Sequence, residues 1–255
     1  MTAKFKVNGV EVEAEAGSSL LDAVRQNGFE VPSLCHHEAV TPYGACRLCL
    51  VEVTRGGRKK ITTSCNYEVQ GGIEVLTDSE QIRRHRAMVL ELLLAEAPRS
   101  VSLRSFAAAH GVRNSRFARP DAPALLDERE GCILCGLCVR ACEEMGRDAI
   151  SLLQRGVSKE VGPPPGGEAD SCIGCGSCHA VCPTGHIAMR DTAKAREIWG
   201  RMFDFVLCEG CGGPVITTAH RDHAIERGGL PADYYLRCAE CKKSGLAARF
   251  AKVGS

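Results

Sequence analysis

Eight cysteines in the second half of the chain repeat one pattern, with gaps of two, two and three residues. The first copy consists of Cys132, Cys135, Cys138 and Cys142, and the second of Cys172, Cys175, Cys178 and Cys182, which Pro183 follows. Three closely spaced thiolates supply one face of a [4Fe–4S] cubane, and the fourth cysteine of each run binds the other cluster. We therefore assign Cys132, Cys135, Cys138 and Cys182 to one centre. The second centre takes Cys142, Cys172, Cys175 and Cys178.

Two other kinds of site use part of this pattern. Zinc knuckles are one, but zinc takes four ligands and leaves no role for the doubled set. A c-type haem is the other, because Cys175, Cys178 and His179 match its attachment pattern. Both cysteines already belong to the ferredoxin spacing, so we expect His179 to be a polar neighbour of the cluster. Small residues would let backbone amides approach the sulfur atoms: Gly136, Gly174 and Gly176.

An N-terminal group has a different spacing, with gaps of ten, two and fifteen residues between Cys35, Cys46, Cys49 and Cys65. Plant-type [2Fe–2S] ferredoxins combine a short first gap, a close pair and a distant fourth ligand. Here the pair and the distant cysteine are kept and the first gap is wider. We predict a [2Fe–2S] centre, with a structural zinc site as the alternative. A Rieske-type centre would use histidine ligands such as His36 and His37, but the four cysteines already suffice for a [2Fe–2S] cluster. We expect both histidines to face solvent or to hydrogen-bond to the cluster loop.

A third group near the C-terminus consists of two knuckles: Cys208, Cys211, Cys238 and Cys241. Such an all-thiolate set is typical of a zinc ribbon or a rubredoxin-like iron site. We favour zinc over iron, and the iron alternative includes a fourth cluster. Because four cysteines complete the site, we expect His220 and His223 at the surface.

Short strands and one helix must position the first group. Asn8-Gly9 predicts a hairpin turn between the strands Lys4–Val7 and Val10–Ala14. A helix follows, capped by Ser19 and ended by Gly28. Further strands are expected at Leu50–Val53 and Ile73–Leu76, with a turn at Gly56-Gly57. This order of elements is that of a β-grasp ferredoxin.

The cysteines also divide the chain into four predicted domains. Residues 1–78 form the β-grasp [2Fe–2S] domain, and residues 79–130, which lack cysteine, form a helical connector whose helix is capped by Ser79 and stopped by Pro98. Residues 131–190 form the two-cluster [4Fe–4S] ferredoxin domain. Residues 191–255 form a zinc-ribbon-like tail, which we expect to open with a helix over Thr192–Met202. The predicted fold class is α+β.

Composition excludes several classes of function. A net charge of +1 gives no electrostatic case for nucleic acid or an anionic membrane as the main partner. The N-terminal residues lack an apolar run and twin arginines, so we expect no signal peptide. The longest apolar stretch, Met88–Leu94, is too short to span a bilayer. A cytoplasmic location is the expected default, and sixteen cysteines there are better metal ligands than disulfides.

The sequence holds no nucleotide-binding glycine motif and no Ser/His/Asp grouping. We therefore predict no catalytic residue and no flavin or nicotinamide site in this chain. Substrate chemistry would take place on another subunit.

Four stretches around the cysteines resemble an iron–sulfur subunit family: Val31–His37, Gly44–Cys49, Cys132–Glu143 and Cys172–Gly185. The family is shared by complex I (its large peripheral-arm subunit), NAD-linked hydrogenases and NAD-dependent formate dehydrogenases. The resemblance covers about residues 3–190 and implies a β-grasp [2Fe–2S] domain, a helical connector and a two-cluster domain. Two full [4Fe–4S] motifs bring the chain nearer to the hydrogenase and formate dehydrogenase members.

The chain departs from this family in two places. Members usually carry a further [4Fe–4S] site in the connector, with one histidine and three cysteine ligands after a leucine-rich helix end. Here Ala97 stands where the histidine would be, and no cysteine follows before Cys132. We infer that this site is deleted and that the four-cysteine tail is an addition.

The expected function is a relay of electrons between a flavin-containing NAD(P)H-oxidising subunit and a catalytic oxidoreductase subunit, such as a hydrogenase or formate dehydrogenase. The chain would belong to a hetero-oligomeric complex and would not insert into a membrane. One alternative is the iron–sulfur subunit of a succinate dehydrogenase or fumarate reductase, against which the wide first gap and the symmetric motifs argue. A redox-sensing regulator that binds nucleic acid through its tail is another.

Overall fold

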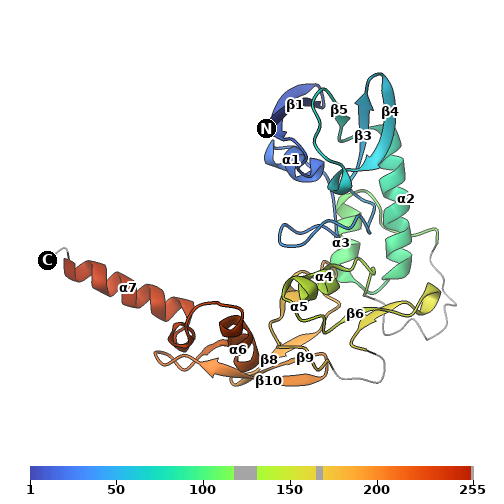
Figure 1. Ribbon diagram of the computed structural model, residues 1–255. Helices are drawn as coiled ribbons and strands as arrows, with labels where there is room; N and C mark the ends of the chain where they lie inside the picture. The colour runs from blue at the N-terminus through green and yellow to red at the C-terminus, as the bar shows by residue number, and fades with distance from the viewer. Residues whose placement is uncertain (118–130, 165–168, 254–255) are drawn as a thin grey trace.

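The computed structural model describes residues 1–117, 131–164 and 169–253. Figure 1 shows an N-terminal sheet above two connector helices, α2 and α3, which lead down to the cysteine-rich helices α4 and α5. A second sheet lies below these helices and carries the chain to α7, which projects from the rest of the molecule (Figure 1). The predicted cysteine groups therefore follow one another along the molecule.

The N-terminal sheet has five strands in the order β2-β1-β5-β3-β4. Their bounds are Thr2–Val7 (β1), Val10–Glu15 (β2), Leu50–Arg55 (β3), Arg58–Thr63 (β4) and Glu74–Leu76 (β5). Strand β1 pairs with β5 in parallel, and the other pairings are antiparallel. The predicted hairpin is present, because Asn8 and Gly9 have φ angles of 51° and 85°, as a tight two-residue turn requires. The turn at Gly56-Gly57 joins β3 to β4 as expected.

Helix α1 (Leu20–Gln26) packs on this sheet. The Ser19 side chain accepts a hydrogen bond from the Asp22 amide, and Gly28 follows the helix with a positive φ angle, so both predicted ends are correct. Leu20 and Leu21 are fully buried in one core with Phe5. This core fixes the start of the loop that carries Cys35.

The connector consists of α2 (Glu80–Glu96) and α3 (Val101–Ala109), with Ser79 and Ser100 as N-terminal caps. In α2 the buried apolar residues are Ile82, Leu90 and Leu94. Arg86 donates from Nε to the carbonyl oxygen of Leu48 at 3.1 Å, which attaches α2 to the first cysteine loop. The rest of the predicted connector, residues 118–130, lies outside the described residues.

The two-cluster region is built around α4 (Leu137–Glu144) and α5 (Ser177–Ala180), which lie side by side (Figure 1). Both begin after a left-handed glycine, Gly136 or Gly176. The short strands β6 (Ser151–Leu153) and β7 (Glu160–Gly162) form a separate antiparallel pair. The sequence repeat of the cysteine motif is therefore also a structural repeat of loop, glycine and helix.

The predicted helix over Thr192–Met202 is wrong, because this segment forms a hairpin. A four-stranded antiparallel sheet contains β8 (Met189–Asp191), β9 (Ala195–Ile198), β10 (Arg201–Leu207) and β11 (Pro214–Thr217). Trp199 and Gly200, with φ angles of 54° and 72°, form the two-residue turn between β9 and β10. The predicted boundary at residue 190 falls inside β8.

After this sheet the chain forms α6 (Thr218–Glu226), the 3₁₀ helix η4 (Ala232–Leu236) and α7 (Ala239–Val253). Ile198 and Phe203 of the sheet share a core with Val139, Ile150 and Cys178 of the two-cluster region. The tail sheet is therefore packed directly against the second cysteine repeat.

Candidate functional site

The four N-terminal cysteines, Cys35, Cys46, Cys49 and Cys65, are all buried and come together at one end of the first sheet. The Cys46 amide donates to the Sγ atom of Cys35 at 3.3 Å, and the Leu34 amide donates to the Sγ atom of Cys46 at 3.4 Å. A hydrogen bond from the Cys46 side chain lowers the pKa of Cys35, and a hydrogen bond from Cys65 does the same for Cys49. In each pair, one sulfur atom therefore accepts hydrogen bonds from the other cysteine and from the backbone.

Cys132, Cys135, Cys138 and Cys182 line one cavity in the two-cluster region. Cys182 comes from the second repeat and joins three cysteines of the first, which is the grouping expected from the spacing. Burial is the main cause that raises the pKa of Cys135 to about 11 and that of Cys138 to about 12, and the charges of neighbouring cysteines act in the same direction. These sulfur atoms would be protonated on their own, so the set suits a metal cluster that compensates several negative charges.

Cys142, Cys172, Cys175 and Cys178 line a second cavity, which also includes Ile198 and Trp199. Burial raises the pKa of Cys178 to about 11. Backbone amides point at the sulfur atoms, with Gly174 donating to Cys172 at 3.4 Å and Ala149 to Cys142 at 3.3 Å. The second site thus has amide donors aimed at its sulfur atoms, as an iron–sulfur cluster needs.

The tail sheet closes the second site through two side chains that sequence reasoning missed. The indole of Trp199, the only tryptophan in the sequence, donates to the Sγ atom of Cys178. Arg196 of β9 donates from Nη1 to the carbonyl oxygens of Gly174 and Cys175, both at 3.0 Å. Neither residue is linked to the cysteine motif by local spacing, so no sequence signal pointed to these contacts.

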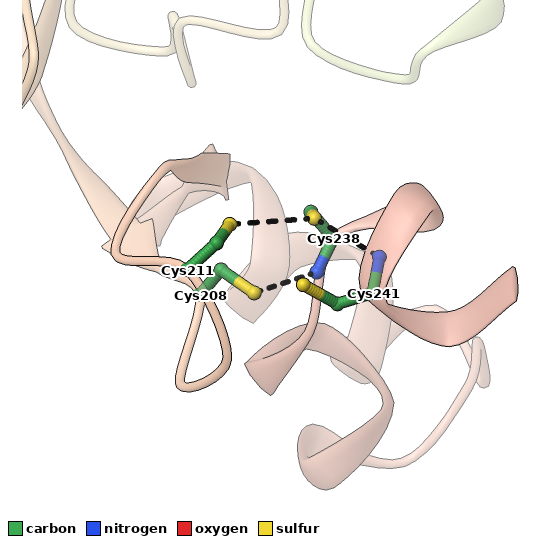
Figure 2. A group of neighbouring side chains, drawn as sticks. All are labelled: Cys208, Cys211, Cys238 and Cys241. Carbon is green, nitrogen blue, oxygen red and sulfur yellow. Dashed lines mark hydrogen bonds between the residues drawn. The ribbon is translucent and has the colours of Figure 1, made fainter. Parts of the chain in front are cut away.

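The four tail cysteines form a tighter group, shown in Figure 2. The Sγ atoms of Cys208, Cys211, Cys238 and Cys241 all lie within 4.8 Å of one another. Cys208 follows β10, Cys211 precedes β11, and the other two flank the start of α7. Backbone amides support the sulfur atoms, with Cys238 donating to Cys208 at 3.3 Å.

The spacing of these sulfur atoms distinguishes the tail site from the others. The Sγ atoms of Cys211 and Cys238 are 3.8 Å apart, and a tetrahedron with metal–sulfur bonds of about 2.3 Å has edges of about 3.8 Å. Among the described residues, no other cysteine set meets the same 4.8 Å limit. A cluster places several iron atoms between its ligands and needs the wider sets. The tail therefore fits a single ion, and the ferredoxin-like sets fit clusters.

The histidines near these sites have other partners. His36 was expected to face solvent or the cluster loop, and this is wrong, because its buried side chain pairs with Asp22 of α1 at 2.7 Å. His179 hydrogen-bonds to the carbonyl oxygen of Ile187 at 2.6 Å. His223 was expected at the surface but is buried, with Nε2 at 2.8 Å from the carbonyl oxygen of Met145. His220 is half-buried, and burial lowers its pKa.

No helix in the described part of the chain is long and apolar enough to cross a membrane.

Known proteins match the chain over its cysteine-rich parts. A family profile for a 2Fe-2S iron-sulfur cluster binding domain matches residues 1–80, and two profiles for a 4Fe-4S dicluster domain match residues 124–189 and 171–215. The crystal structure of an NAD+-reducing [NiFe]-hydrogenase in the H2-reduced state has a chain with a TM-score of 0.61 and 29% identity. That match covers 72% of this chain and 85% of the hydrogenase chain.

Several curated relatives are longer proteins. One subunit of the NADH-quinone oxidoreductase of Streptomyces coelicolor is 31% identical, with 87% of this chain and 28% of the relative covered. NADPH-Fe(3+) oxidoreductase subunit alpha of Geobacter sulfurreducens is 29% identical over the same shares of each chain. NADP-reducing hydrogenase subunit HndD of Solidesulfovibrio fructosivorans is 29% identical, covering 70% of this chain and 34% of that subunit. The chain thus spans about a third or less of these relatives.

These matches confirm the resemblance drawn from the cysteine motifs. The chain joins a [2Fe–2S] domain to a [4Fe–4S] dicluster domain. Its homologues are iron–sulfur subunits of NAD(P)H-linked oxidoreductases and hydrogenases.

Proposed function

We propose that this chain relays single electrons through one [2Fe–2S] and two [4Fe–4S] clusters. The observation that carries the proposal is the presence of three buried or cavity-lining sets of four cysteines along one molecule. The [2Fe–2S] cluster takes Cys35, Cys46, Cys49 and Cys65 as ligands. The first [4Fe–4S] cluster takes Cys132, Cys135, Cys138 and Cys182. The second takes Cys142, Cys172, Cys175 and Cys178.

The clusters would supply the one-electron chemistry, and the protein controls their surroundings. Apolar residues such as Ile133 and Ile187 cover the first cavity, while Ile198 covers the second, which limits access of water. Amide and indole N–H groups aimed at the sulfur atoms stabilise the added negative charge of a reduced cluster. The chain's own residues thus bind the clusters and set their potentials.

The domain organisation proposed here follows from the same sites. The parallel pairing of β1 with β5 and the helix between two hairpins support a β-grasp domain for residues 1–78. The connector takes residues 79–130, the two-cluster domain residues 131–190, and the tail residues 191–255.

We propose zinc as the occupant of the tail site, in a zinc-ribbon-like arrangement. Support comes from the close, all-sulfur set of Cys208, Cys211, Cys238 and Cys241, which suits one tetrahedral ion. The cysteines join the end of β10 to the start of α7. An ion there would hold together a part of the chain that has few large buried side chains among its described residues, 208–247.

The partners proposed for the relay are a flavoprotein subunit that oxidises NAD(P)H and a catalytic oxidoreductase subunit, in a cytoplasmic hetero-oligomeric complex. The names of the relatives support this proposal, since they are subunits of NADH-, NADPH- or NADP-linked enzymes. The chain matches only part of each relative, so the partners must be identified on this protein directly.

Anaerobic purification followed by metal analysis tests the proposal. We expect about ten iron atoms and one zinc ion per chain, with paramagnetic signals of three clusters after reduction. About fourteen iron atoms without zinc would mean that the tail holds a further cubane. The isolated chain should not reduce a dye with NADH, and adding the native flavoprotein partner should restore this activity. Robust NADH turnover by the isolated chain would refute the relay.

A further inference from the structure

Arg140 connects the first two cysteine sets. It lies on α4 between Cys138 and Cys142, yet its guanidinium group reaches the N-terminal cysteine loop. Nη2 donates to the carbonyl oxygen of Cys35 at 3.0 Å and to that of Cys135 at 3.4 Å. One side chain therefore binds the backbone of a ligand from each of two proposed clusters.

The groups that the end of the Arg140 side chain contacts lie in the widened first gap of the N-terminal motif. Nη1 donates to the carbonyl oxygen of Thr41, and the guanidinium carbon is 5.7 Å from the centre of the Tyr43 ring. Thr41 and Tyr43 belong to the ten residues between Cys35 and Cys46. Plant-type ferredoxins have a much shorter gap, so the extra length here provides the surface that Arg140 binds.

This loop depends on such contacts because it has no helix or strand of its own. Val40 is buried in the same core as Cys35, Ile133 and Cys135, so the loop is packed against the first [4Fe–4S] region. The planar fork of an arginine can bind several carbonyl oxygens in fixed directions, which a lysine cannot. Arg140 thus fixes the loop relative to α4.

The charge of Arg140 is also placed to act on both clusters. Its Nε is buried without a hydrogen-bond partner among the described residues, and its other nitrogens bind neutral carbonyl groups. A positive charge near a cluster favours the reduced, more negative state and so raises the reduction potential.

We propose that Arg140 is a positioning residue that clamps the Cys35–Cys46 loop against the first [4Fe–4S] region and raises the potentials of both neighbouring clusters. This inference rests on the proposed function, because it assumes that the two cysteine sets hold clusters.

The test compares Arg140→Gln with Arg140→Lys in the full chain, loaded with its clusters under anaerobic conditions. In Arg140→Gln, the potentials of the [2Fe–2S] and first [4Fe–4S] clusters should both shift negative, while the second [4Fe–4S] potential stays closer to its original value. Amides of residues 36–45 should exchange hydrogen faster. Arg140→Lys keeps the charge and loses the fork, so it should retain the potentials but still show faster exchange.

The control is Arg58→Gln, which removes a positive charge from the exposed hairpin of the first sheet. It should change neither the cluster potentials nor the hydrogen exchange of residues 36–45. Unchanged potentials and exchange in Arg140→Gln would overturn the proposal, as would equal shifts in Arg58→Gln. If Arg140→Gln does not load its clusters, Arg140→Lys decides, and normal exchange in its loop would overturn the clamp. Absence of cluster signals from the unaltered protein would instead refute the proposed function.

Discussion

The indole Nε1 of Trp199 lies 3.5 Å from the Sγ atom of Cys178, and the two residues come from the tail sheet and from α5. Trp199 reaches this sulfur from a turn in which its own backbone is left-handed, with a φ angle of 54°. A bulky residue adopts this conformation only when its surroundings hold it there. The contact therefore couples the β9–β10 hairpin to the second [4Fe–4S] site.

Replacing Trp199 by Phe should make the second [4Fe–4S] cluster harder to reduce. The change removes the N–H donor and keeps an aromatic ring, and a hydrogen bond of about 1 kcal/mol corresponds to a few tens of millivolts for one electron. A redox titration followed by electron paramagnetic resonance measures the shift. The [2Fe–2S] potential serves as the internal control. An unchanged second cluster would contradict a role for the indole N–H.

Gly174→Ala should separate the tail sheet from the second cluster site. A Cβ atom at residue 174 would lie 2.6 Å from Cγ of Phe203, and the φ angle of 63° is unfavourable for alanine. We expect a loss of roughly 2–5 kcal/mol in the free energy of unfolding, measured by denaturant titration.

Gly228→Ala is the matched control for this substitution. Its φ angle is 76°, and no atom lies within 4 Å of the added Cβ. It should lower the free energy of unfolding only by the cost of a left-handed backbone for alanine, about 1–2 kcal/mol. Equal losses in the two variants would mean that the Phe203 contact contributes nothing.

Cys46→Ser should remove the [2Fe–2S] signal and leave both [4Fe–4S] signals. A serine oxygen is a harder and poorer ligand for iron than a thiolate, and the buried Cys46 sulfur accepts a hydrogen bond from the Leu34 amide within this set. Iron content should fall by about two atoms. The measurement is low-temperature paramagnetic resonance of the reduced protein with parallel iron analysis. Loss of a [4Fe–4S] signal instead would refute the assignment of Cys46.

Cys211→Ser should weaken the tail without changing the iron content. A structural zinc site contributes its binding energy to folding, so we expect loss of zinc and faster hydrogen exchange over residues 208–241. Assembly with partner subunits should also weaken, since the altered part of the tail is exposed around Cys211. If an iron–sulfur signal disappears while assembly is intact, the tail is a fourth redox site.

The local features of this chain could be predicted from its sequence. Cysteines three residues apart must lie in one or two turns, and Asn8-Gly9 and Ser19 act on their immediate neighbours, so the structure agrees with the sequence at these points. Contacts between distant residues were not predictable in this way. Arg140 binds Cys35 across 105 residues, and His223 binds Met145 across 78. Neither partner is indicated by local spacing.

The error at Thr192–Met202 has a different cause. The order of polar and apolar residues in this segment fits a helix about as well as a strand, so hydrophobic periodicity alone does not decide between the two. Trp199-Gly200 is not one of the usual hairpin dipeptides, because tryptophan rarely adopts a positive φ angle. The contact with Cys178 stabilises this turn, and that contact exists only in the folded chain.

Ala97, which the sequence resemblance matches to a cluster-binding histidine, caps the C-terminal end of α2 and is fully buried among Leu94, Leu103 and Ala107. An imidazole at this position would need space that the packed helices now fill, and it would be a buried polar group without partners. Three cysteines would have to arise in the same connector before the histidine had a use. A connector cluster could therefore not be built at this position by one substitution, because the packing of the two helices and the supply of thiolate ligands would have to change together.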